Sequence, residues 1–73
     1  MPRANLKHLV EDAERRVQRA QRNIDRQGEV VSALERDNRD TTIAKALLKI
    51  FEKANAIHVA DRDRLIKRLA DRG

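Results

Sequence analysis

The sequence predicts an all-α protein, in which two long amphipathic helices fold back on each other as an antiparallel, coiled-coil-like hairpin. Two observations support this prediction. Apolar residues recur at alternating steps of four and three along the chain, and turn-forming residues gather in one short segment near its middle. A heptad repeat of this kind is typical of packed helices, whereas a strand or a loop has no physical reason to show it.

The first predicted helix covers residues 4–37. Its small or apolar positions follow one another at heptad spacing, with Gln27 as the one position that interrupts them. Gly28 lowers the stability of a helix by about 1 kcal/mol relative to alanine. The heptad repeat on both sides of it is the stronger signal, so we still predict a continuous helix. The stripe consists of Leu6, Val10, Ala13, Val17, Ala20, Ile24, Val31 and Leu34.

The predicted turn covers residues 38–41. Asn38 can adopt the left-handed conformation that ends a helix, because its short amide side chain tolerates a positive φ. Asp40, Thr41 and Thr42 each offer a side-chain oxygen that can cap the free N–H groups of the next helix. Because so short a connection returns the chain on itself, we expect the second helix to lie antiparallel to the first.

The second predicted helix covers residues 42–71, and its apolar face is wider than one neighbouring helix can cover. The main face contains Ile43, Leu47, Ile50, Phe51, Ala54, Ile57, Leu65 and Leu69, and a weaker line contains Leu48, Val59 and Ile66. We therefore expect a second copy to cover the excess, giving a homodimeric four-helix bundle. The predicted oligomer interface is Leu47, Leu48, Ile50, Phe51, Ile57, Val59, Leu65 and Ile66.

Length and composition exclude several classes of protein. The 73 residues form one predicted domain, 1–73, and without cysteine it can hold no disulfide. The longest apolar run, 46–48, is far too short to span a bilayer, and the first residues lack the apolar core of a signal peptide. We therefore expect a cytoplasmic protein that does not bind membranes.

Basic residues line both predicted helices, and the net charge is +5. One interpretation is contact with nucleic-acid phosphates without sequence specificity. The other is a solvated helix face, which we favour because acidic residues lie within one turn of several arginines and no aromatic side chain is interleaved with the basic residues for base stacking. The candidate phosphate contacts are Arg15, Arg19, Arg22, Arg26, Lys45, Lys49 and Lys53.

Polar residues also fall near the predicted apolar face of the second helix. His58 and Asp61 are too few to hold a metal, and we interpret them as a buried pair that fixes the helix register. Counting outward from the turn places Asp61 opposite Arg15 or Arg16, the expected partners of its carboxylate. The same count places Gln27 opposite Phe51.

The sequence contains no sign of catalysis. No cysteine is present, its hydroxyl residues are a mid-helix serine and two cap candidates, and it has no glycine-rich phosphate loop. We therefore predict a protein without catalytic, cofactor-binding or metal-binding residues. Its expected role is that of a self-associating structural or interaction module, with a larger protein as a further candidate partner. The alternative is a small basic nucleic-acid-associated protein.

Residues 24–27, 34–41, 48–51 and 57–65 together resemble a family of small uncharacterised bacterial proteins. Members of that family have a first helix, an E-R-D-G-x-D-T-like turn, and a second helix with an H-V-A-x-R-D-R-L-like end. The resemblance would cover nearly the whole chain, with Asn38 at the place where the family's turn has glycine. It implies a helical hairpin and no particular activity, substrate or binding residue.

Overall fold

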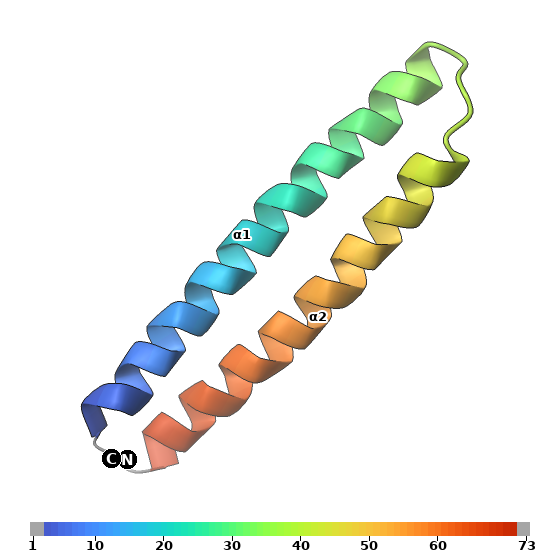
Figure 1. The fold of residues 1–73 in the computed structure, drawn as a ribbon. Coiled ribbons are helices and arrows are strands. Elements are labelled where there is room, and N and C mark those ends of the chain that lie inside the picture. The colour runs from blue at the N-terminus through green and yellow to red at the C-terminus, as the bar shows by residue number, and fades with distance from the viewer. Residues whose placement is uncertain (1–2, 72–73) are drawn as a thin grey trace.

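The computed structural model describes residues 3–71 of the chain, which form two α-helices joined by a short turn. Helix α1 spans Arg3–Arg36 and helix α2 spans Thr42–Asp71. The helices run side by side in opposite directions and form a rod with dimensions of 54 × 14 × 14 Å (Figure 1). The predicted helical hairpin is therefore confirmed. The outermost residues of the expected domain 1–73, which are 1, 2, 72 and 73, lie outside the described part.

After the end of helix α1, Asn38 adopts the left-handed conformation that the sequence predicts for it. Asn38 has a φ of 56°, and its backbone N–H donates to the carbonyl oxygen of Glu35 at 3.1 Å. The N–H of Arg39 donates to the carbonyl oxygen of Leu34 at 2.8 Å. These two bonds form a Schellman motif, which provides partners for carbonyl groups that the end of a helix leaves free.

Helix α2 begins with a cap formed by the turn. The carbonyl oxygen of Thr41 accepts the first helical hydrogen bond, from the N–H of Lys45 at 2.8 Å. The Asp40 carboxylate accepts hydrogen bonds from the N–H and the hydroxyl of Thr42, at 2.9 and 2.7 Å. The hydroxyl bond, followed by the backbone bond, lowers the pKa of Asp40 below its usual value. The charged form of Asp40 therefore stabilises the start of α2.

The stripe predicted for α1 forms its side of the contact between the helices. Leu6, Val10, Ala13 and Val31 are buried, and the other members of the stripe, together with Gln27, are half-buried. Every heptad position from Leu6 to Leu34 thus faces α2, as the alternating spacing predicted. Burial of these side chains supplies most of the hydrophobic stabilisation of the hairpin.

The stripe predicted for α2 is confirmed only in part: Phe51, Leu65 and Leu69 face α1, but the helix is rotated so that the other predicted members lie outside the contact. Ile43, Ile50 and Ile57 are 85%, 60% and 64% exposed, although they were assigned to the inner face. The side of α2 that contacts α1 is a different heptad series, one residue further along the chain. It consists of Ala44, Leu48, Phe51, Asn55, His58, Arg62, Leu65 and Leu69, all buried or half-buried.

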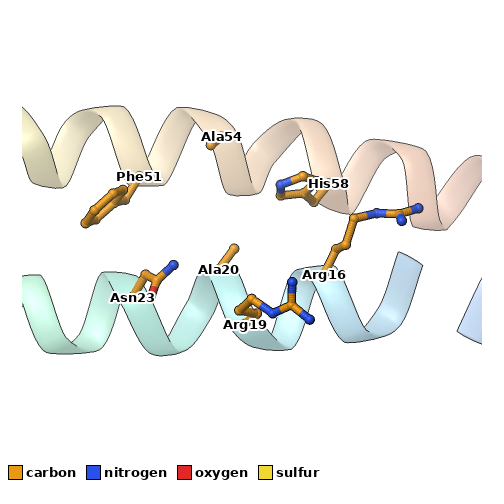
Figure 2. A pocket seen from close by; sticks show the side chains of 7 residues that line it. All are labelled: Arg16, Arg19, Ala20, Asn23, Phe51, Ala54 and His58. Atoms are coloured by element: carbon orange, nitrogen blue, oxygen red, sulfur yellow. The ribbon is translucent and has the colours of Figure 1, made fainter. Parts of the chain in front are cut away.

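Side-chain size accounts for this rotation. In the middle of the α1 stripe, the small Ala20 leaves room for the long side chains of Phe51 and His58 on α2, which lie on either side of it along the groove (Figure 2). Close to the turn, where the α1 stripe contains Gln27, α2 presents the small Ala44, whose carbonyl oxygen Gln27 reaches. The most apolar stripe of α2 therefore stays outside, because the less apolar one fits α1 better in size.

Candidate functional site

The two faces of the hairpin that flank the helix contact differ in which residues they carry. We call a residue that packs against the other helix a contact position. In both helices, the residue just before a contact position lies on one face of the hairpin and the residue just after it lies on the opposite face, because the helices are antiparallel. Arg16, Arg19 and Ala54 precede contact positions and line one groove, whereas Gln21 and Glu52 follow them and line another. We call these the front face and the rear face.

An exposed apolar row runs along α2 on the front face. Its members are spaced by four, three, four and three residues, so they form a second heptad series beside the one that packs on α1. Val30 of α1, which is 42% exposed, lies on the same face because it precedes the buried Val31. We call this series the isoleucine row; it consists of Ile43, Leu47, Ile50, Ala54 and Ile57, all exposed.

The predicted oligomer interface is divided between three places. Leu48, Phe51 and Leu65 are half-buried between the helices of one chain, which makes them part of the hairpin contact. Val59 is half-buried in the rear groove, and Ile66, 41% exposed, follows a contact position and lies on the rear face. The structure brings three members together on one exposed surface: Leu47, Ile50 and Ile57.

The front groove lies between the helices, beside the isoleucine row, and has a volume of about 280 Å³. Figure 2 shows Phe51, Ala54 and His58 of α2 facing side chains of α1 across it. Arg16 and Arg19 lie at the end occupied by His58, and Asn23 lies at the end occupied by Phe51. The floor is apolar and one end is basic. The full lining is Arg16, Arg19, Ala20, Asn23, Phe51, Ala54 and His58.

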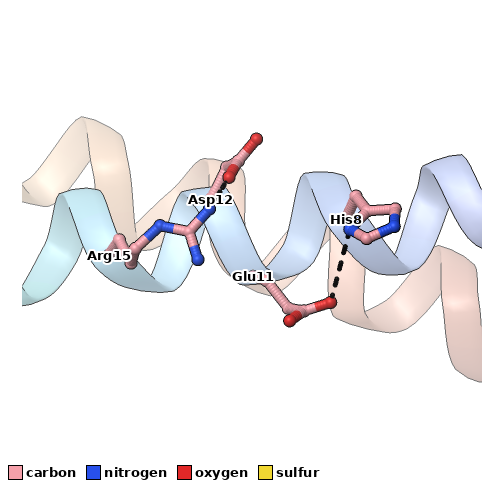
Figure 3. Close-up of polar contacts among 4 residues, drawn as sticks. All are labelled: His8, Glu11, Asp12 and Arg15. Carbon is pink, nitrogen blue, oxygen red and sulfur yellow. Dashed lines mark hydrogen bonds and ion pairs between the residues drawn. The ribbon is translucent and has the colours of Figure 1, made fainter.

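Asp61 does not form the predicted buried pair. Its side chain is 45% exposed, and its carboxylate lies 3.3 Å from the guanidinium of Arg64, one turn along the same helix. Arg15, one expected partner, pairs with Asp12 instead (Figure 3). Arg16, the other expected partner, lines a pocket together with Asp61, as the count from the turn predicted, but the two do not form an ion pair. The cause is again the rotation of α2, which puts Asp61 on the front face and places Arg62 at the contact position. Gln27 likewise bonds to the backbone of Ala44, and the expected alignment with Phe51 is wrong.

The candidate phosphate contacts do not form one surface. Arg19 and Arg26 precede contact positions of α1 and belong to the front face, whereas Lys45 and Lys49 follow contact positions of α2 and belong to the rear face. Lys45 also lies 3.6 Å from the Glu35 carboxylate. This pair joins the two helices, whereas His8 pairs with Glu11 one turn along the same helix (Figure 3), and exposed pairs of both kinds contribute little to stability. The candidate phosphate contacts are therefore divided between different faces of the hairpin.

The described residues contain neither a cluster of metal ligands nor a membrane-spanning helix. Within residues 3–71, no group of three or more histidine and acidic side chains could hold a metal ion. Neither helix, over the same residues, contains a stretch long and apolar enough to cross a membrane.

Comparison with known proteins identifies no relative. No protein-family model, curated protein or solved structure matches this sequence. The resemblance to small bacterial hairpin proteins therefore stays a prediction, and the function has to be argued from the surfaces of the hairpin itself.

Proposed function

We propose that this protein is a non-enzymatic interaction module that binds a second copy of itself through the isoleucine row. The observation that carries the proposal is the exposure of Ile43, Ile50 and Ile57 on one face of α2. Single exposed apolar side chains are common on proteins, but a continuous row at heptad spacing is typical of helices that pack on another helix. Complete burial of each isoleucine would contribute about 1.5–3 kcal/mol.

A second copy is favoured as the partner because the isoleucine row is complementary to itself when reversed. In an antiparallel pairing of two α2 helices, Leu47 lies opposite Ile57 of the second copy, and Ile50 lies opposite Ala54 of the second copy. The large Ile50 thus meets a small side chain, and the pairing repeats on the other side of the two-fold axis. A symmetric interface of this kind covers Leu47, Ile50, Ala54 and Ile57 without another protein, and Ile43 lies at its edge, opposite Asp61 of the second copy.

Self-association also compensates for the small core of one hairpin. Five apolar side chains are buried among the described residues, four of them on α1 and one, Ala44, on α2. Chains of this size without a disulfide or metal commonly depend on oligomerisation or on very regular helix packing. Covering the isoleucine row would give α2 a second apolar contact.

The test is a pair of matched variants on opposite faces. Ile50→Glu places a charge in the isoleucine row, and Ile66→Glu makes the same change at an exposed position on the rear face. Light scattering behind a sizing column should show a monomer for Ile50→Glu and a dimer for Ile66→Glu, with equal helicity by circular dichroism. Dissociation by Ile66→Glu alone would instead place the interface on the rear face.

A further inference from the structure

The front groove has two chemically different ends. Phe51 and Asn23 lie at one end, and His58, Arg16 and Arg19 lie at the other (Figure 2). Phe51 and His58 are seven residues apart on α2, so the ends are separated by about 10 Å along the helix. A small molecule that spans the groove would therefore meet an aromatic ring at one end and basic groups at the other.

All ionisable side chains that line the groove are bases. They are Arg16, Arg19 and His58, and no carboxylate lines the groove. Within residues 3–71, none of these three side chains takes part in an ion pair or a side-chain hydrogen bond, in contrast to Arg15, Arg62 and Arg64. Arg16 also lines a neighbouring pocket that contains Asp61, but the Asp61 carboxylate pairs with Arg64, so the guanidinium donors of Arg16 and Arg19 remain available to a ligand. Their positive charge favours an anion.

We propose that the front groove binds a small phosphomonoester that carries an apolar group. The phosphate lies at the basic end of the groove, which Arg16, Arg19 and His58 line, and the apolar group lies against Phe51 and Ala20. Two guanidinium groups match a phosphomonoester, which carries a charge of about −1.5 to −2 at neutral pH, better than a singly charged carboxylate. Planar guanidinium groups also bind phosphate oxygens in a bidentate manner.

This proposal does not rest on self-association. The groove is formed by the two helices of one chain, and it shares a single residue, Ala54, with the isoleucine row. Loss of the dimer would leave its lining in place, and loss of ligand binding would leave the isoleucine row unchanged. Because a second copy would cover Ala54, the binding titration is repeated on the Ile50→Glu variant, which is expected to be monomeric, so that failure of one proposal is distinguishable from failure of the other.

The binding test is a nuclear magnetic resonance titration of the full chain with three probes. Phenyl phosphate should shift the backbone resonances of Ala20, Phe51 and His58 in a saturable manner. Inorganic phosphate, which lacks the apolar group, should bind about tenfold more weakly, and phenol, which lacks the charge, should cause no saturable shift. Equal affinity for phenol and phenyl phosphate would overturn the role of the arginines.

Matched charge variants decide whether the site is specific. Arg16→Gln and Arg19→Gln should each weaken phenyl phosphate binding by about tenfold, the loss expected for one charge-assisted interaction. Arg39→Gln removes the same charge from the turn, at the far end of the hairpin, and should leave the affinity unchanged. An equal loss in all three variants would mean diffuse attraction to a basic protein and would overturn the proposal.

Discussion

The side-chain amide of Gln27 donates a hydrogen bond to the backbone carbonyl oxygen of Ala44, at 3.0 Å, across the contact between α1 and α2. The bond joins residues that are 17 positions apart and lies close to the turn. A polar residue in an otherwise apolar heptad series commonly fixes the register of packed helices. Gln27 therefore fixes the axial register of α2 against α1. The small side chain of Ala44 allows the Gln27 amide to reach the backbone of α2.

Removing this bond should destabilise the hairpin. Gln27→Ala leaves the Ala44 carbonyl without its side-chain partner, and we expect a loss of about 1–2 kcal/mol in the free energy of unfolding. Gln18→Ala, at an exposed position of the same helix, is the matched control and should be nearly neutral. Urea unfolding at one protein concentration measures both. Equal losses of stability in the two variants would contradict a role for Gln27 in fixing the register.

Gly28 is a position at which a substitution should stabilise helix α1. A Cβ atom added there would have no heavy atom within 4 Å outside the helix's own nearby backbone, so alanine fits without displacing a neighbour. We expect Gly28→Ala to raise the free energy of unfolding by up to about 1 kcal/mol, through the higher helix propensity of alanine. Thermal unfolding followed by circular dichroism checks this. A lower melting temperature would show that the site needs glycine for a contact with another molecule.

The cap of α2 should make stability dependent on pH in acid. The hydrogen bonds from Thr42 lower the pKa of Asp40, so the folded state favours the charged carboxylate. Its contribution is therefore fully present above the usual pKa and is lost as the pH falls below about 4 toward the lowered value. Asp40→Asn cannot titrate, so unfolding curves between pH 2 and pH 7 should lack this component. Identical pH profiles for the two proteins would exclude a role for the Asp40 charge.

Asn55 occupies a contact position of α2 and carries a buried carbonyl oxygen, Oδ1, without a hydrogen-bond partner. An unsatisfied buried acceptor costs about 1–3 kcal/mol, and leucine would continue the apolar series between Leu48 and Leu65. We expect Asn55→Leu to raise the melting temperature. Asn55→Ala, which removes the polar group without filling the space, should raise it less. Destabilisation by both variants would mean that the amide makes an interaction essential to the fold.

Much of the fold could be predicted from the sequence, because local signals agree with one another. The heptad series of α1, the left-handed residue Asn38 and the capping group of Asp40 each act over a few residues. Residues 4–37 and 42–71 were expected to be helical, and the helices span Arg3–Arg36 and Thr42–Asp71. Long amphipathic helices with clear ends require little information from elsewhere in the chain.

The orientation of α2 could not be predicted from hydrophobicity, because α2 contains two heptad series offset by one residue. The isoleucine row is the more apolar, and the series that packs on α1 includes Asn55, His58 and Arg62. A signal that distinguishes them is the size of the facing residue: the small Ala20 leaves room for Phe51 and His58. The front groove follows from that orientation, so it was missed together with it.

The mass of the unmodified protein in solution tests the central proposal most directly. Sedimentation equilibrium at micromolar concentrations should give twice the chain mass of 8.4 kDa, because the isoleucine row is covered by a second copy. Association driven by apolar contact between two chains of equal charge should persist or strengthen when salt is added. A mass of 8.4 kDa at every protein and salt concentration, with full helicity, would contradict self-association and leave the isoleucine row as a binding surface for a different protein.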